Sequence, residues 1–171
     1  MIDSLRIEIK KLASPERAKV LAGFFKTGKG QYGENDLFLG ISVPDSRRIA
    51  VKYKDLPSDE IRELLKSKIH EERLIALLIL VHNFRLGSVS SRKEIFEYYL
   101  ANTKYINNWD LVDLSADKIV GEYLFARGTA TSPPTAVSLR SQPGSFAKSS
   151  VRPPNPLPQG RGNILIRLAS S

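Results

Sequence analysis

The only tryptophan of the chain lies in a short segment that also carries three aspartates, NNWDLVDLSADKIVGEYL, residues 107–124. Trp109 precedes Asp113 by four residues, so a helix would bring the two side chains together on one face. A carboxylate that is partly desolvated against an aromatic ring acts strongly on a nearby cation. Asp113, with Trp109 beside it, is therefore the candidate for catalysis.

The other two aspartates of this segment have simpler explanations. Asn107 or Asn108 can cap the helix, which places Asp110 in the first turn, where the helix dipole favours an acid. Asp117 lies further outward and is expected to be solvated. Asp113 itself could also be an ordinary capping or salt-bridge residue beside a core tryptophan, and the spacing leaves both interpretations open.

Other helices must position this segment, because residues 1–125 show apolar residues at helical spacing and no long alternation with period two. Pro15, after Ser14, and Pro44, at the start of PDSRRIAVKYK, are typical first residues of helices. On the Trp109 helix, the apolar stripe is expected to consist of Val112, Ala116, Ile119 and Tyr123.

Two serines mark further helix starts. Ser58 is expected to cap SDEIRELLKSK, and Ser91 forms a capping box with Glu94. The segment HEERLIALLILVHNF is apolar almost all round, which predicts a helix buried between neighbours.

The predicted helices come in pairs, over about 44–68 and 70–103, and a third pair begins near 108. A repeat of roughly 30–38 residues without a strong consensus is typical of a HEAT-like α-solenoid. We therefore expect an all-α, HEAT-like helical-repeat fold. A plain helical bundle is the alternative.

The composition changes after Leu124. Residues 126–171 hold seven of the ten prolines, six basic residues and no acid, and they show no periodicity. Such a segment cannot bury enough apolar surface to fold. We expect a helical domain at 1–125 and a Pro/Ser-rich, irregular or disordered basic tail at 126–171. The tail is either an arm that binds nucleic acid or a non-native end, such as a frameshift or fusion, and the second interpretation is favoured.

The net charge of +8 comes mostly from this tail, since residues 1–125 carry 20 basic and 18 acidic side chains. An anionic partner must therefore be argued from a local patch. There is no cysteine, which excludes disulfides and thiolate chemistry. The longest apolar run, at 74–81, is far shorter than the roughly 20 residues of a membrane span, and the N-terminus lacks a signal-peptide core. A cytoplasmic protein is expected.

Two short motifs suggest ligands that their contexts do not support. GKGQYG at 28–33 fits G-x-G-x-x-G, but it follows a helix instead of a strand, so no dinucleotide site is expected. HEERL resembles half of a zinc-binding helix, but Leu74 occupies the place of the second histidine. His70 and His82 are expected to be ordinary helix residues, and we predict no metal and no cofactor.

Five residues are candidates for contacts with a phosphate backbone. A glycine-rich loop flanked by basic side chains allows close approach of backbone amides to phosphates, and two arginines on a first helical turn can bind them. A plain inter-helix loop and a solvated arginine pair are the alternatives. The candidates are Lys26, Lys29, Tyr32, Arg47 and Arg48.

Three segments, FLGISVPDSRRIA, SDEIRELLKSKIHEERLIALLIL and YINNWDLVDLSADKIVGEYL, occur in this order. Together they resemble the AlkD-type family of DNA alkylation repair proteins, which are alkylpurine DNA glycosylases built from HEAT-like repeats. The resemblance covers essentially residues 1–125 and is most specific in the W-D-x-V-D motif.

The resemblance implies a monofunctional glycosylase that removes cationic N3- or N7-alkylated purines, such as 3-methyladenine and 7-methylguanine, from double-stranded DNA. The duplex lies in a concave basic groove, without the deep base pocket of ordinary base flippers. By this resemblance, Trp109 packs against the deoxyribose of the lesion. Asp113 stabilises the developing oxocarbenium sugar and positions the attacking water. A monomer that needs no metal is expected.

The family continues through further helical pairs, which supply an arginine near the lesion and a second tryptophan. This chain has only Trp109, so the expected fold is a truncated, N-terminal portion of such an enzyme, with the activity of the chain left open. A non-enzymatic HEAT-like module that binds DNA structure or a protein partner is the alternative function.

Overall fold

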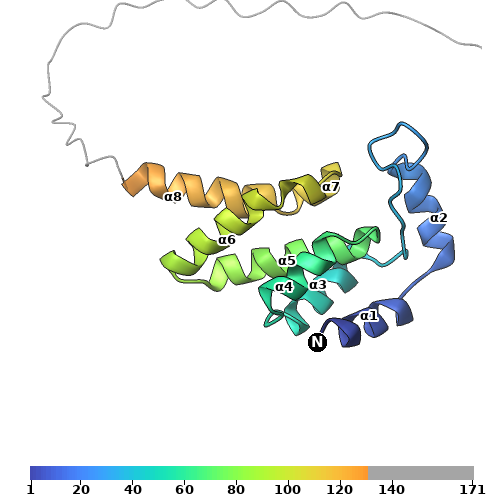
Figure 1. Cartoon of the computed structure of the whole chain (residues 1–171), viewed down its shortest axis with the longest axis horizontal. Coiled ribbons are helices and arrows are strands. Elements are labelled where there is room, and N and C mark those ends of the chain that lie inside the picture. The colour runs from blue at the N-terminus through green and yellow to red at the C-terminus, as the bar shows by residue number, and fades with distance from the viewer. Residues whose placement is uncertain (131–171) are drawn as a thin grey trace, which may run out of the picture. The chain divides into compact units, whose positions relative to one another are not determined.

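The computed structural model describes residues 1–130 of the chain. Within this range the fold is all-α, as predicted, and the only extended pairing is one isolated bridge between Leu37 and Ile69. The helices are α1 (Ile2–Lys11), α2 (Pro15–Phe24), α3 (Val43–Lys52), α4 (Ser58–Leu65), α5 (His70–Leu86), α6 (Val89–Ala101), α7 (Trp109–Asp113) and α8 (Glu122–Ala130) (Figure 1). A short 3-10 turn precedes α7, and a π-helical turn precedes α8.

The helices pack on one another in chain order from α3 onward. The pair α3 and α4 contacts α5, the helix α5 contacts α6, and α6 in turn contacts the segment from α7 to α8. Figure 1 shows α5 between the first pair and α6. This order is compatible with a helical-repeat solenoid.

The predicted helix starts are correct at α2 and shifted at α4 and α6. Ser14 caps α2, because its side chain accepts a hydrogen bond from the amide of the third helical residue. Pro57, instead of Ser58, is the N-cap of α4. Ser88 caps α6 in place of the predicted Ser91, because Gly87 directly before it ends α5 and leaves no room for a longer loop.

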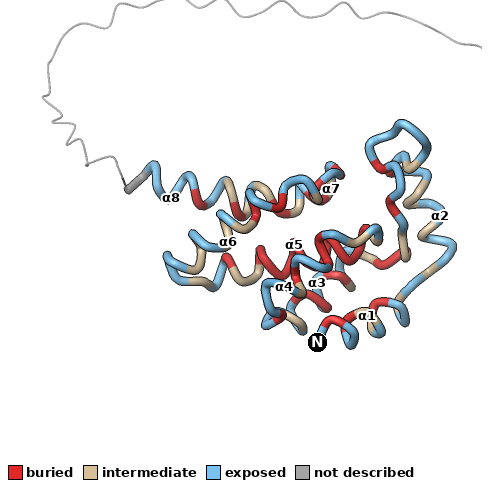
Figure 2. The backbone as a smooth tube through the Cα atoms, in the orientation of Figure 1, coloured by how far each residue is buried: buried red, intermediate tan, exposed pale blue. Residues whose placement is uncertain are grey.

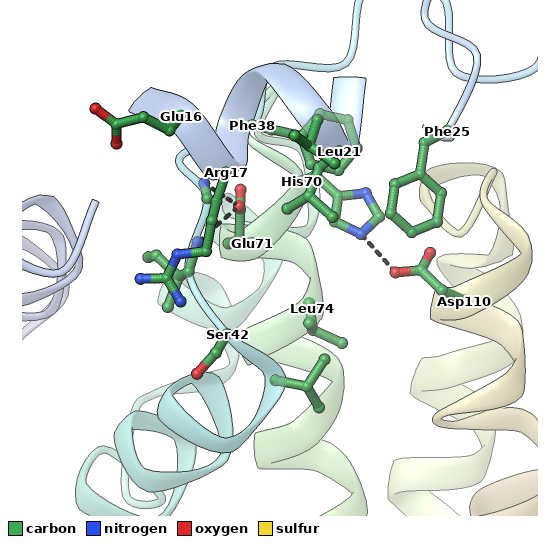
Figure 3. Close-up of a pocket in the computed structure, with 14 residues that line it drawn as sticks. Glu16, Arg17, Leu21, Phe25, Phe38, Ser42, His70, Glu71, Leu74 and Asp110 are labelled. Carbon is green, nitrogen blue, oxygen red and sulfur yellow. Dashed lines mark hydrogen bonds and ion pairs between the residues drawn. The ribbon is translucent and has the colours of Figure 1, made fainter. Parts of the chain in front are cut away.

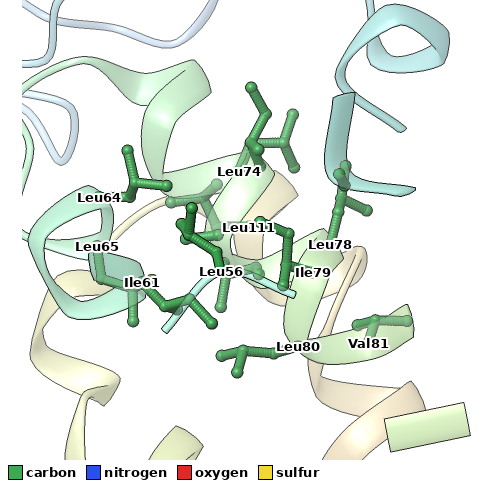
Figure 4. Packing of buried hydrophobic residues seen from close by; sticks show 14 of the residues in the cluster. Leu56, Ile61, Leu64, Leu65, Leu74, Leu78, Ile79, Leu80, Val81 and Leu111 are labelled. Carbon is green, nitrogen blue, oxygen red and sulfur yellow. The ribbon is translucent and has the colours of Figure 1, made fainter. Parts of the chain in front are cut away.

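The core is centred on α5, which is buried over nearly its whole length, as predicted from its apolar sequence (Figure 2). Leu64 of α4, Leu74 of α5 and Leu111 of α7 point into one cluster (Figure 4). Burying a leucine side chain contributes about 1.5–3 kcal/mol, so this cluster is what holds the three helices together.

The first turn of α5 is polar and nevertheless buried. Glu72 forms two hydrogen bonds with the guanidinium of Arg6 in α1, at 3.2 and 3.3 Å. The Glu71 carboxylate accepts hydrogen bonds from the backbone amides of Leu39, Gly40 and Ile41, at 3.0, 2.7 and 3.3 Å. Two acids at this position also complement the positive end of the helix dipole. This turn therefore fixes α1 and the segment that leads into α3.

None of the helices in residues 1–130 is long and apolar enough to cross a membrane. Helix α8 continues to Ala130, and the rest of the predicted tail at 126–171 lies outside the described residues. The boundary at 125 stays a prediction.

Candidate functional site

The segment of the tryptophan and the aspartates folds as two helical pieces instead of one helix. Helix α7 ends at Asp113, the chain turns, and a π-helical turn at Asp117–Gly121 leads into α8. Three residues of the expected stripe are confirmed, since Ile119 and Tyr123 are buried and Ala116 packs against the core. Val112 does not belong to it, because the interruption after Asp113 shifts the helical phase. The buried residues are Leu111, Ser115, Ile119 and Tyr123, whereas Val112 is 41% exposed.

Trp109 is held by aromatic rings on one side. Its ring lies 5.5 Å from that of Phe25 and 6.0 Å from that of Phe24, measured between centroids. Phe25 stacks in turn on Phe38 and on His70. The indole remains 47% exposed. Trp109 therefore combines a ring that is held by its neighbours with a surface that is partly exposed.

Asp113 lies four residues after Trp109 and is exposed. Its carboxylate forms no hydrogen bond or ion pair with any residue in 1–130. The expectation that the carboxylate is already partly desolvated is therefore wrong for this structure, because α7 ends at Asp113 and no residue in 1–130 covers it. The two residues are exposed on one short helix, and the carboxylate is free to act on a ligand.

Asp110 does more than complement the helix dipole. Its Oδ2 lies 2.7 Å from Nε2 of His70 at the start of α5, and its Oδ1 accepts the amide hydrogen of Leu111 (Figure 3). Asn108 occupies the N-cap position, but its side chain makes no capping hydrogen bond. The expectation of an ordinary helical His70 is also wrong. Because the two residues lie 40 positions apart in the sequence, no local pattern indicates their contact.

His70 belongs to a buried charged network. The guanidinium of Arg73 donates a 2.6 Å hydrogen bond to Asp36, whose carboxylate lies 3.8 Å from Nδ1 of His70. Burial lowers the pKa of His70, but Asp110 and Asp36 outweigh it, so the pKa is raised. Burial raises the pKa of Asp36, but His70 and Arg73 outweigh that effect, so its pKa is lowered.

A pocket of about 390 Å³ lies beside this network, between α2, the segment leading into α3 and the start of α5 (Figure 3). Its walls are largely apolar, and Phe25, His70 and Asp110 form part of them. Trp109 and Asp113 do not line it, so the candidate site is an exposed surface and not this cavity. Among residues 1–130, no group of three histidine, aspartate or glutamate side chains is placed to hold a metal ion.

The predicted loop residues Lys26, Lys29 and Tyr32 are exposed in the segment that follows α2. This segment begins directly after the two phenylalanines that contact Trp109. It folds back so closely that a side chain at Gly33 would lie 2.6 Å from the carbonyl oxygen of Phe25, so only glycine fits there. The next helix begins at residue 43, one residue before the predicted helix start at Pro44.

The predicted arginines of α3 differ in their surroundings. Arg48 forms an ion pair with Asp45, whereas Arg47 has no ion pair with any residue in 1–130. Arg47 lines a groove of about 440 Å³ between α3 and α5, together with His82 and Arg85. No acidic side chain lines this groove. Sequence reasoning missed the last two residues, because only the packing of α3 on α5 places them beside Arg47.

Comparison with protein families gives one match that spans most of the chain. A family model described as "DNA alkylation repair enzyme" matches residues 5–138, which include α7. The resemblance noted in the sequence is therefore confirmed at the level of the family. No curated protein and no solved structure matches the chain significantly.

Proposed function

Because the chain belongs to the DNA alkylation repair enzyme family, we propose that it is an AlkD-like glycosylase with HEAT-like repeats. Its reaction is hydrolysis of the N-glycosidic bond of cationic N3- or N7-alkylated purines in double-stranded DNA. The observation that carries this proposal is the joint exposure of Trp109 and Asp113 on one short helix. We further propose that the protein acts as a cytoplasmic monomer.

The chemistry needs little more than these two side chains. An alkylated purine that carries a positive charge leaves readily with the electron pair of the C1′–N bond, so no strong general acid is required. Positive charge then develops on the deoxyribose, and the Asp113 carboxylate stabilises it. Water adds to C1′ and passes its proton to solvent by way of Asp113. The exposed part of the Trp109 indole supports the sugar.

The exposure of Asp113 in the free protein is compatible with this role. A duplex that covers Trp109 displaces water from the neighbouring carboxylate, and the attraction between this carboxylate and a cationic sugar becomes stronger as the dielectric constant falls. The Asp113 carboxylate would thus be desolvated only in the complex with DNA.

Basic side chains outside the site supply the contacts that hold the duplex. Arg47, Arg85 and His82 line one groove without an acid, and Lys26 and Lys29 are exposed in the loop after the phenylalanines that contact Trp109. Contacts with phosphates fix the position of DNA without reading its sequence. This arrangement suits an enzyme whose specificity comes from the charge of the damaged base.

The proposal is tested with a duplex that contains a single 7-methylguanine. The chain is incubated in excess, and free 7-methylguanine and abasic sites are measured by mass spectrometry and by strand cleavage in alkali. Release of the base with an equal amount of abasic sites supports the proposal, and an unmodified duplex is the control. Binding of the duplex without release would instead favour the non-enzymatic binding module.

A further inference from the structure

Helix α7 carries the candidate site but is not self-supporting. It has only five residues, and isolated helices shorter than roughly 12–15 residues are marginal in water. The side-chain amide atoms of its N-cap residue, Asn108, are buried and have no hydrogen-bond partner in residues 1–130. Catalytic groups must be held within about 0.5 Å of their productive positions. Contacts outside α7 must therefore hold Trp109 and Asp113 in place.

One polar contact joins the start of α7 to the core. The 2.7 Å hydrogen bond between Asp110 and His70 is shielded from water, since the two side chains are 13% and 3% exposed. Asp110 is the residue next to Trp109 and lies three positions before Asp113. His70 is the first residue of α5, the longest and most buried helix in residues 1–130. The hydrogen bond thus transfers the rigidity of α5 to the site.

The imidazole of His70 is itself locked in position. Its ring stacks on Phe38 at 4.6 Å and on Phe25 at 5.3 Å, and Asp36 lies on the side opposite Asp110. Phe25 also contacts the indole of Trp109. His70 is therefore connected to α7 in two ways, by a hydrogen bond to Asp110 and by ring contacts through Phe25.

We infer that His70 and Asp110 are positioning residues, whose hydrogen bond sets the orientation of Trp109 and Asp113 relative to the body of the protein. The catalytic consequence of this inference rests on the proposed glycosylase function. The structural consequence does not, because the orientation of Trp109 can be measured without any reaction.

The same turn of α5 provides a matched control. Glu72 joins Arg6 of α1 to α5 through a similar charged pair, and within residues 1–130 neither side chain forms a hydrogen bond or ion pair with α7. The variant Arg6→Met removes that pair, together with the 2.6 Å ion pair from Arg6 to Glu63 of α4, and loosens α1. Asp110→Ala removes the pair that holds α7. A purely structural role predicts that both variants act only through the free energy of unfolding. A positioning role predicts a further effect that only Asp110→Ala shows.

The first measurement uses the fluorescence of Trp109, the only tryptophan in the chain. In Asp110→Ala, the indole should show lower anisotropy and stronger quenching by acrylamide than in the parent protein. Asp110→Asn, whose amide oxygen can still accept from Nε2–H of His70, should stay close to the parent, as should Arg6→Met. Unchanged anisotropy and quenching in a folded Asp110→Ala would overturn the inference.

The second measurement is the single-turnover rate of excision with enzyme in excess over a 7-methylguanine duplex. Because a misplacement of about 1 Å can cost 10²-fold in rate, we expect Asp110→Ala to be roughly 10- to 100-fold slower. The dissociation constant for the duplex should not change. His70→Phe keeps a stacked ring but lacks Nε2, so it removes the same hydrogen bond and should show the same loss of rate. It provides the test if Asp110→Ala fails to fold.

The double variant completes the test. If the two residues act through one hydrogen bond, His70→Phe combined with Asp110→Ala should excise no more slowly than either single variant. Additive losses, or a parent-like rate in Asp110→Ala, would overturn the inference. Absence of excision in the parent protein would overturn the proposed function instead, and the fluorescence measurement would then decide the inference alone.

Discussion

The three aspartates of the segment at 107–124 have different environments, although they are closely spaced in the sequence. Asp117 is solvated, as its outward position predicted, and within residues 1–130 its one ion pair is with Lys118. Asp113 is exposed and lies one turn from Trp109, so its proposed catalytic role requires that bound DNA covers its carboxylate. Residue-level reasoning also missed the contact of Asp110 with His70, because the helix dipole explains an acid there equally well without His70.

At the same scale, Arg47 is expected to contact a DNA phosphate. Arg47→Ala should weaken binding of an unmodified duplex and reduce the slope of log K against log salt by about 1, since one fewer counterion is released. Fluorescence anisotropy of labelled DNA at several salt concentrations measures both effects. The control is Lys52→Ala on the same helix, because Lys52 forms a 2.6 Å ion pair with Glu8. Equal slopes for the two variants would contradict the assignment.

At the scale of the helices, the sequence predicts what periodicity and capping residues determine and misses what distant contacts determine. The buried helix α5 and the start of α2 follow from local patterns. The break after Asp113 could not be predicted in this way, because apolar residues continue at helical spacing on both sides of it. The burial of the polar first turn of α5 also cannot be predicted from the local sequence. Its hydrogen-bond partners lie in α1, in α7 and in the segment leading into α3.

The network at the start of α5 should make stability depend on pH. The pKa of His70 is raised above its ordinary value of 6.5, so its contribution is full below pH 6.5 and is lost as pH rises through the folded-state pKa. The pKa of Asp36 is lowered below 3.8, so its contribution is full above pH 3.8 and is lost as pH falls through the folded-state pKa. The charged neighbours of His70 are Asp36, Arg73 and Asp110.

We therefore expect the free energy of unfolding by urea to be highest between these two values. The variant His70→Gln should remove the decline above pH 6.5 and leave the decline at low pH. Urea titrations of both proteins from pH 3 to pH 9 check this, and the difference between them isolates His70 from other titrating groups. A parent-like alkaline decline in His70→Gln would show that another group causes it.

At the scale of the whole molecule, the described part of the chain is a stack of helices, compatible with a helical-repeat solenoid, and the chain belongs to the DNA alkylation repair enzyme family. The stack places a short, exposed helix with Trp109 and Asp113 against the start of its most buried helix. The family and the all-α class could be predicted from sequence, because both depend on patterns spread over more than 100 residues. The support of the site could not, because it depends on pairs of residues from different helices.

The most direct test of the central claim is the single-turnover excision of 7-methylguanine by Asp113→Asn. Removing one preorganised electrostatic group should slow excision by roughly 10²-fold or more, with unchanged affinity for the duplex. Asp117→Asn, which alters a solvated carboxylate of the same segment, should excise at the rate of the parent protein. A rate for Asp113→Asn within about threefold of the parent would contradict the role assigned to Asp113.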